Sequence, residues 1–168
     1  MLPRWRKPID VQLATEDELA VMIDILIEAA GWLSNNGVDQ WPVSPRAYWH
    51  RRAARAISRQ EAYLAYVDGS AQATLRLIWV DDYWPSADKS AAYLHSLAIR
   101  DGLHGQGLGV ALLAWCKAYA RAKDKTVLRL DCLAGNRRLR QYYEAQGFIY
   151  QREIVDNDYN AALYEIEL

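Results

Sequence analysis

Two hydrophobic periodicities divide the chain into alternating strands and helices. Apolar residues that alternate or run continuously over short stretches predict strands, at 9–13, 62–67, 71–80, 93–99, 127–133, 148–155 and 161–168. Apolar residues spaced three and four positions apart predict helices, after Thr15, after Ser44, from Leu108 and over 136–146. The long helix from Leu108 connects two strands, so a right-handed crossover should make these strands parallel. The pattern therefore predicts an α/β fold with a mixed sheet.

Local signals mark the ends of several elements. Thr15 with Glu18 forms a capping box, and Ser44-Pro45 predicts a helix with Ser as N-cap and Pro as its first residue. Asp68-Gly69 is a two-residue hairpin turn, and Gly147 occupies the position of a helix-ending glycine. The sequence contains no repeat or linker, so we expect a single domain over 1–168.

A glycine-rich turn, LHGQGLGV over 103–110, joins the strand at 93–99 to the following helix. Glycines let backbone N–H groups crowd around a ligand, and a helix N-terminus adds about half a positive charge. The turn therefore predicts an anion site, most simply for a phosphate. The dinucleotide fingerprint lacks its third glycine here, and no P-loop Gly-Lys-Ser/Thr is present. A glycine turn that merely connects strand and helix is the structural alternative.

The same segment resembles the acyl-CoA pyrophosphate loop of the GNAT superfamily of N-acyltransferases. The family pattern is Arg/Gln-x-x-Gly-x-Gly/Ala after a strand that ends Leu-x-Val/Ile. This chain has His104-Gly105-Gln106-Gly107-Leu108-Gly109 after Leu97-Ala98-Ile99, with His104 in place of Arg or Gln. A later segment matches Asn-x-x-Ala-x-x-x-Tyr-x-x-x-Gly-Phe at Asn136, Tyr143, Gly147 and Phe148, with Leu139 for Ala. The order of the elements is also that of GNAT enzymes, so the resemblance covers nearly the whole chain.

This resemblance implies acetyl-CoA as the acyl donor and assigns residues to its parts. In GNAT folds two parallel strands splay apart, and the pantetheine arm pairs with the backbone of one of them, here at Leu97 and Ile99. The pyrophosphate would bind amides of 104–110, and Asn136 would hydrogen-bond the arm. Arg137, Arg138 or Arg140 would meet the adenosine phosphates, or is simply solvated. The expected acetyl-CoA contacts are Leu97, Ala98, Ile99, His104, Gly105, Gln106, Gly107, Leu108, Gly109, Val110, Asn136, Arg138 and Tyr143.

Acetyl transfer to an amine passes through a tetrahedral oxyanion, for which a backbone N–H near Leu97 is the natural donor. The resemblance makes Tyr143 the general acid that protonates the leaving thiolate; a packing role is the alternative. His95 is a candidate general base, because the ordinary pKa of histidine, about 6.5, suits that role. A water chain could replace it, and a strand histidine could simply be packed. Asp131 is a weaker candidate, because alternation does not show which face of its strand it occupies.

Three loops combine carboxylates with aromatic rings, which attract ammonium groups. They are Asp39-Gln40-Trp41, 81–84 and 156–159, and ordinary polar turns are the alternative interpretation. The expected substrate contacts are Asp39, Gln40, Trp41, Trp84 and His95, and the expected substrate is a small cationic amine. The stretch from Asp156 also imitates the start of a calcium-binding EF-hand loop, but Ala161 replaces the required glycine. We therefore expect no metal.

Composition narrows the function further. Lys and Arg total 20 against 21 Asp and Glu, a net charge of −1, so nothing calls for nucleic acid or a membrane surface. The arginines of the second predicted helix are expected to be solvated. No apolar run spans a membrane, no signal peptide is visible, and Cys116 and Cys132 suggest reduced thiols, which together predict a cytoplasmic protein.

Two classes of function follow. The first is an acetyl-CoA-dependent N-acetyltransferase acting on a primary amine. The second is a catalytically inactive module of the same fold that binds acyl-CoA or an amine as a sensor or interaction domain. The presence of Tyr143 favours the enzyme. The acceptor, the length of the acyl group and the oligomeric state stay open, with a homodimer as one alternative.

Overall fold

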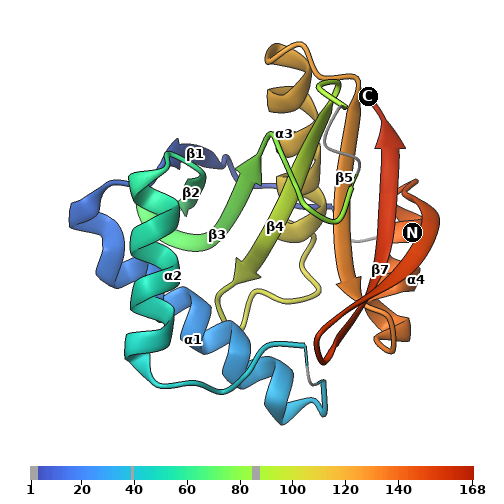
Figure 1. Ribbon diagram of the computed structural model, residues 1–168. Coiled ribbons are helices and arrows are strands. Elements are labelled where there is room, and N and C mark those ends of the chain that lie inside the picture. The colour runs from blue at the N-terminus through green and yellow to red at the C-terminus, as the bar shows by residue number, and fades with distance from the viewer. Residues whose placement is uncertain (1–3, 39, 85–87) are drawn as a thin grey trace. The chain divides into compact units, whose positions relative to one another are not determined.

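The computed structural model describes residues 4–38, 40–84 and 88–168. Its strands form one mixed sheet, as the sequence predicts. Their hydrogen-bonding order is β1-β2-β3-β4-β5-β7-β6. Figure 1 shows the elements, which are β1 (Asp10–Leu13), η1 (Glu16–Glu18), α1 (Leu19–Asn35), α2 (Arg46–Ser58), β2 (Ala62–Val67), β3 (Ser70–Ile78), β4 (Ala91–Ile99), α3 (Leu108–Ala122), β5 (Val127–Leu133), α4 (Arg137–Ala145), β6 (Ile149–Asp156) and β7 (Tyr159–Glu167).

The chain divides into two compact units, and both β4 and α3 cross from one unit to the other. Unit 1 comprises Met1–Leu77 and Ser96–Leu112, and unit 2 comprises Ile78–His95 and Leu113–Leu168. Each unit contains a hydrophobic cluster of its own. The division inside β4 falls between His95 and Ser96, at a residue whose backbone leaves the strand conformation: Ser96 has a φ of 51°.

Unit 1 is built on the β2–β3 hairpin, with β1 antiparallel beside β2. Its turn residues, Asp68 and Gly69, have φ values of 51° and 77°, the left-handed pair that a two-residue hairpin turn requires. The core of the unit forms where α1 and α2 pack their small and branched apolar residues against this hairpin (Figure 1). The Asp-Gly prediction is therefore confirmed.

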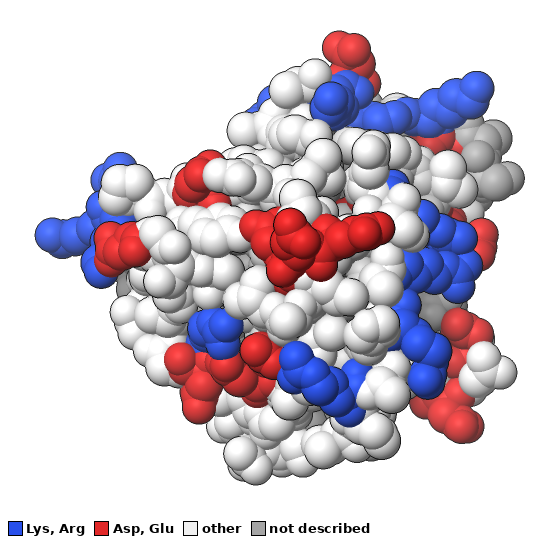
Figure 2. Space-filling view, turned by 90° about the vertical axis from the view of Figure 1, so that its left-hand side faces the viewer, with Lys and Arg blue, Asp and Glu red and all other residues white. Residues whose placement is uncertain are grey.

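The outer face of α2 carries the arginines that the sequence places in solvent. Arg51, Arg52, Arg55 and Arg59 are all exposed, whereas Ala53, Ala56 and Ile57 of the same helix are buried. The face drawn in Figure 2 carries both acidic and basic side chains, each gathered in several places among uncharged ones. This distribution agrees with the small net charge and with a solvated role for these arginines.

The start of α2 differs from the sequence prediction by one residue. The helix begins at Arg46, and Pro45 is its N-cap with an extended ψ of 151°. The Pro45 carbonyl accepts the N–H of Tyr48 at 2.9 Å, which closes the first turn one residue later than expected. The prediction of Ser44 as N-cap and Pro45 as first helical residue was therefore wrong, because the proline kept an extended backbone.

Unit 2 contains β5 between β4 and β7. Val127–Leu130 pair in parallel with Ala91–Leu94 of β4, as the crossover predicts, and β7 pairs antiparallel with β5 and β6. Along β5, Leu128, Leu130 and Cys132 are buried in the core. Arg129 and Asp131 alternate with them and therefore point to the opposite face of the sheet.

The last helix has the ends that the sequence predicts. The Asn136 side chain caps α4 by accepting the N–H of Leu139 at 3.1 Å. Gly147 follows the helix with a φ of 87°, the left-handed conformation that ends many helices and that glycine adopts without strain. These two residues fix the length of α4 and thereby the place of Tyr143 on it.

Candidate active site

His95 and Asp131 occupy the point where the parallel pairing of β4 and β5 ends. The paired register runs to Leu94 and Leu130, and the next residue on each strand is His95 and Asp131. The Nδ1 atom of His95 lies 3.5 Å from Oδ1 of Asp131. The face that Asp131 occupies, which the sequence left open, is therefore the one that His95 faces.

Asp81, in the loop after β3, meets the other side of the same imidazole. Its Oδ2 contacts Nε2 of His95, and its Oδ1 accepts the backbone N–H of Tyr83 at 2.8 Å. The side chain of Asp81 is 8% exposed, that of Asp131 12% and that of His95 21%. Each ring nitrogen of His95 thus faces a largely buried carboxylate.

Two phenols extend this group of charges, which we call the His95 cluster: Asp81, Tyr83, His95, Asp131, Asp156 and Tyr159. Tyr159 donates its hydroxyl to Oδ2 of Asp131 at 3.0 Å, and Tyr83 donates to Oδ2 of Asp156 at 2.9 Å. Burial, with the neighbouring carboxylates, raises the pKa of both phenols. Both tyrosines therefore stay protonated and act as hydrogen-bond donors across the neutral range.

The His95 cluster carries more negative than positive charge. Its members include three carboxylates, Asp81, Asp131 and Asp156, against one imidazole. Burial raises the pKa of Asp131, the nearby charge of His95 opposes this rise, and Asp81 adds to it. A desolvated carboxylate beside a second carboxylate is stabilised by an incoming cation. The arrangement is therefore suited to an ammonium group.

In unit 1, the loop after β4 has the backbone of an anion site. Gly105 and Gly107 have φ values of 75° and 92°, which residues with side chains rarely adopt. A Cβ built at Gly105 meets nothing within 4 Å, so the space beside the backbone is open. Because α3 begins at Leu108, the N–H groups of its first turn have no partner within the helix. These features fit a phosphate group.

Contacts with α1 hold this loop in place. Arg100 donates to the Ala71 carbonyl at 3.0 Å and pairs with the Glu28 carboxylate. One turn further along α1, the Trp32 ring stacks on the His104 ring with centroids 4.1 Å apart and planes 14° apart. The loop after β4 therefore folds back onto α1.

Comparison with known proteins identifies the family. The model of the acetyltransferase (GNAT) family matches residues 26–148. The chain belongs to this family.

Individual relatives are distant in sequence and close in fold. The uncharacterized N-acetyltransferase YesJ of Bacillus subtilis (strain 168) is 25% identical over 141 residues, which are 80% of this chain and 78% of YesJ. A GNAT acetyltransferase from Listeria monocytogenes 4b F2365 superposes with a TM-score of 0.76 at 23% identity, covering 95% of both chains. The aminoglycoside acetyltransferase AAC(6')-Ib, solved with coenzyme A and kanamycin, superposes with a TM-score of 0.75 at 20% identity, also covering 95% of both chains.

Membership of the GNAT family confirms the expected fold and the expected class of enzyme, an acetyl-CoA-dependent acetyltransferase. The register of β4 with β5 stops at Leu94, although β4 continues to Ile99. The predicted acetyl-CoA contacts Leu97, Ala98 and Ile99 lie on this continuation, directly after the left-handed Ser96.

Tyr143 of the GNAT motif lies on α4 and is buried, with 7% of its surface exposed. Its ring packs against Phe148 at 5.8 Å and Tyr164 at 6.3 Å between centroids. Burial above all raises its pKa, and the charge of Asp131 adds to the effect. Its phenol therefore keeps its proton at neutral pH, which a general acid needs.

The neighbouring Tyr142 differs from Tyr143 in its surroundings. Among the described residues its buried hydroxyl has no hydrogen-bond partner, and burial raises its pKa to about 12. Its ring lies 5.5 Å from that of Tyr143. Tyr142 is thus a nearby tyrosine outside the family motif.

The structure separates the three arginines that were candidates for the adenosine phosphates. Arg140 is engaged within the protein, with Nε 3.0 Å from the Tyr164 hydroxyl and Nη1 3.2 Å from Glu153. Arg137 and Arg138 are exposed. Arg138 therefore stays a candidate, while Asn136 also serves as the cap of α4.

Two of the expected substrate contacts, Trp41 and Trp84, pack on hydrophobic clusters of the protein. Trp41, next to Gln40, lies 5.8 Å from Trp49 and packs on the core of unit 1. Trp84 is 9% exposed, with the guanidinium of Arg129 lying 4.3 Å from its ring centre. Asp39 lies outside the described residues. Within unit 2, the structure gathers carboxylates around His95 and places Trp84 in a hydrophobic cluster instead.

Four residues of the His95 cluster, Asp81, Tyr83, Asp156 and Tyr159, were not among the substrate contacts expected from the sequence. Their loops are two of the three that combine carboxylates with aromatic rings in the sequence. Choosing among the members of each loop required knowing which side chains point toward His95. Trp84 was chosen in place of Asp81, although the two are close in sequence.

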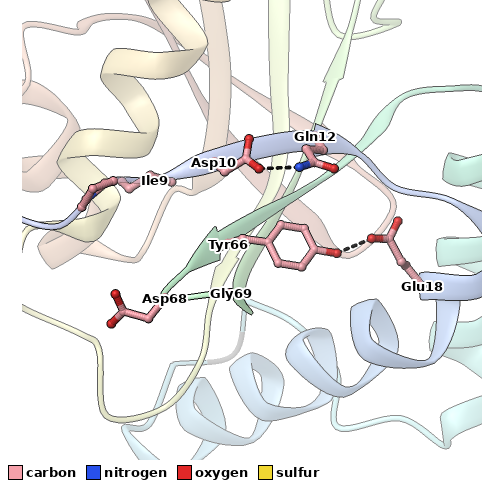
Figure 3. A pocket seen from close by; sticks show the side chains of 8 residues that line it. Ile9, Asp10, Gln12, Glu18, Tyr66, Asp68 and Gly69 are labelled. Carbon is pink, nitrogen blue, oxygen red and sulfur yellow. Dashed lines mark hydrogen bonds between the residues drawn. The ribbon is translucent and has the colours of Figure 1, made fainter.

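A pocket of about 540 Å³ lies in unit 1, beside β1 and the β2–β3 turn (Figure 3). The Tyr66 hydroxyl donates to the Glu18 carboxylate there, and Lys7 pairs with Asp68 at 2.5 Å. None of the predicted site residues lines it.

In the part of the chain that the structure describes, no group of His, Cys, Asp or Glu is placed to hold a metal ion. No described helix is long and apolar enough to cross a membrane.

Proposed function

We propose that this GNAT enzyme transfers an acetyl group from acetyl-CoA to a primary amine of a small cationic molecule. The observation that carries the proposal is the His95 cluster, in which a half-buried imidazole faces a carboxylate at each ring nitrogen. Such a group attracts an ammonium and offers a site for the proton that the ammonium must lose.

The glycine loop supports acetyl-CoA as the donor. Positive φ at Gly105 and Gly107 and the open space beside Gly105 let the backbone approach a pyrophosphate closely. Bound acetyl-CoA supplies a thioester, whose carbonyl carbon accepts the amine. The proposed donor contacts are those that the family resemblance implies, and Arg138 among them is exposed.

The His95 cluster would prepare the acceptor. An ammonium has no lone pair, so the amine must lose a proton before it attacks a carbonyl. We assign this proton to His95. The carboxylates of Asp131 and Asp156, each held by a tyrosine hydroxyl, favour a cationic acceptor over an acidic one by simple charge attraction.

Tyr143 would complete the reaction. When the carbon–sulfur bond breaks, the sulfur leaves as a thiolate, and a phenol that is protonated at neutral pH can donate to it. Burial keeps Tyr143 protonated. The family motif places a tyrosine at this position, and its packing between Phe148 and Tyr164 holds the ring in one place.

Structural relatives suggest the first acceptors to test. AAC(6')-Ib has been solved with coenzyme A together with kanamycin, and also with ribostamycin. Aminoglycosides carry several ammonium groups, which agrees with the excess of carboxylates around His95. At 20% identity this likeness supports only the choice of probes.

A thiol-release assay with acetyl-CoA tests the proposal, using kanamycin, ribostamycin, spermidine, tyramine and lysine as acceptors and aspartate, a primary amine with two carboxylates, as an acidic control. We expect release of CoA with at least one cationic amine and none with the control. Isothermal titration with acetyl-CoA runs in parallel. Tight donor binding without turnover on any amine would favour the alternative, an inactive binding module, and absence of donor binding would contradict both.

A further inference from the structure

Hydrogen bonds to the backbone hold both the side chain and the main chain of Asp81 in place. Its Oδ1 accepts the N–H of Tyr83 at 2.8 Å, and its backbone carbonyl accepts the N–H of Trp84 at 3.1 Å. Trp84 is itself buried, against Tyr93 and Arg129. The loop is thereby fixed so that Oδ2 of Asp81 points at Nε2 of His95.

The two nitrogens of His95 are not equivalent in this setting. Nε2 is within hydrogen-bond distance of Asp81, whereas Nδ1 lies 3.5 Å from Asp131, beyond the usual range for a hydrogen bond. An ionised carboxylate only accepts hydrogen bonds. Nε2 must therefore carry the hydrogen, and in the neutral ring Nδ1 carries the lone pair.

We propose that Asp81 is a positioning residue, which selects the His95 tautomer whose Nδ1 accepts the proton of the acceptor ammonium. This inference rests on the proposed function and extends it to a residue outside the family motifs. An ammonium nitrogen about 2.9 Å from both Nδ1 of His95 and Oδ1 of Asp131 donates one N–H to each. The 3.5 Å between those two atoms leaves room for that arrangement.

The proton balance is complete with groups that the chain supplies. One proton passes from the ammonium to Nδ1, which leaves an imidazolium bonded to Asp81 through Nε2 and facing Asp131 through Nδ1. The amine attacks the acetyl carbonyl, the carbon–sulfur bond breaks, and Tyr143 protonates the sulfur. Tyr143 regains its proton from the nitrogen of the new amide, and the imidazolium returns its proton to solvent. The products are the amide, the CoA thiol and one proton.

The titratable groups of the His95 cluster come from three parts of unit 2 besides β4. The loop after β3 contributes Asp81 and Tyr83, β5 contributes Asp131, and the β6–β7 hairpin contributes Asp156 and Tyr159. Of these, Asp81 is the carboxylate in hydrogen-bond contact with the ring. Its replacement should therefore change the tautomer without removing the attraction of Asp131 for a cation.

The test is Asp81→Asn, with Asp82→Asn as the matched control, because Asp82 is the next residue and is exposed. An asparagine N–H directed at Nε2 would reverse the tautomer and place a hydrogen on Nδ1. We expect kcat/KM for kanamycin, or for spermidine if kanamycin is not acetylated, to fall about 100-fold near pH 7. It should then rise about tenfold per pH unit up to about pH 9, as the amine loses its own proton.

The wild type and Asp82→Asn should show a nearly level profile over the same range. A purely structural role for Asp81 would lower activity by a constant factor at every pH, and that result would overturn the inference. Long-range proton–nitrogen NMR correlations of the histidine rings read the tautomer directly, without any acceptor. A hydrogen on Nδ1 of His95 in the wild type would also overturn it, whereas failure of the proposed function would appear as no turnover by the wild type itself.

Discussion

At the scale of single residues, the site combines groups whose surroundings shift their protonation in useful directions. Burial raises the pKa of Tyr143, so the phenol stays a proton donor. Burial also raises the pKa of Asp131, which makes its carboxylate costly until a cation approaches. The same residues that serve the proposed chemistry are therefore expected to lower the stability of the fold.

Tyr143→Phe removes a hydroxyl and keeps the ring that packs on Phe148 and Tyr164. If Tyr143 protonates the departing thiolate, kcat should fall about 100-fold, because CoA is already a fairly stable leaving group and general acid catalysis is worth about 10²–10⁴-fold. Steady-state kinetics give kcat, and titration should show unchanged acetyl-CoA binding. Tyr142→Phe is the control and should retain full activity. Equal kcat for Tyr143→Phe and wild type would rule out the acid role.

Asp131→Asn tests the electrostatic cost of the cluster. The folded-state pKa of Asp131 is raised by burial, so the folded state holds its proton more tightly, and stability falls as pH rises from the ordinary carboxyl pKa toward the raised value. The asparagine side chain does not titrate, so the variant lacks this fall of stability with rising pH. Its Tm should match that of the wild type below about pH 4, where the ordinary carboxyl is protonated, and should exceed it increasingly as the pH rises toward 8.

Differential scanning calorimetry across this pH range measures the Tm difference. Asp82→Asn again serves as control, because it removes an exposed carboxylate from the same loop. A variant less stable than the wild type near pH 8 would mean that the attraction between His95 and Asp131 outweighs the effect of burial.

At the scale of elements, the glycine loop depends on its attachment to α1. The stack of Trp32 on His104 and the pair of Glu28 with Arg100 hold the loop from one side. His104, at the position where the family pattern has Arg or Gln, therefore helps to hold the loop against α1 by stacking on Trp32. The loop backbone, fixed in this way, is free to present its N–H groups.

Gly105→Ala should weaken acetyl-CoA binding, and Gly69→Ala provides a closely matched control. The two glycines have φ values of +75° and +77°, and a Cβ at either meets nothing within 4 Å. The backbone strain should therefore be similar, about 1–2 kcal/mol. The Cβ of the Gly105 variant alone would occupy space that we assign to phosphate. Calorimetric unfolding should show a similar loss of stability for both variants. Titration should show weaker acetyl-CoA binding for Gly105→Ala only. Equal acetyl-CoA affinity in the two variants would place the pyrophosphate elsewhere.

At the scale of the whole molecule, the two compact units divide the proposed work. Unit 1 contains the glycine loop, to which we assign the donor phosphates, and unit 2 contains the His95 cluster and Tyr143. The boundary crosses β4 at the left-handed Ser96, so one strand supplies residues to both functions.

Acetyl-CoA should raise the Tm of the full chain by mass action, because a ligand that binds only the folded state stabilises it by RT ln(1 + [L]/Kd). At 100 times Kd this amounts to about 2.7 kcal/mol. Thermal-shift measurements should show a clear rise with acetyl-CoA and much smaller rises with NAD or ATP, which lack the pantetheine arm. No shift with millimolar acetyl-CoA on folded protein would contradict the donor assignment.

The sequence by itself determined the features that depend on neighbouring residues. Capping, turn chemistry and periodicity act over a few positions, so the β2–β3 hairpin, the ends of α4 and the glycine loop were predictable. The local sequence did not decide whether Pro45 is the N-cap or the first residue of α2, because both positions are compatible with the fixed φ of proline.

Tertiary structure decided which distant side chains meet. Asp81 reaches His95 across 14 positions of sequence, Tyr159 reaches Asp131 across 28, and Glu28 reaches Arg100 across 72. Alternation along β5 separated two faces but could not say which face was buried beside His95. Which face of β5 lies beside His95 depends on how the strands pair and how the loops fold back. The packing of the whole chain decides this, because each contact is stabilised only when the elements that carry it are already in place.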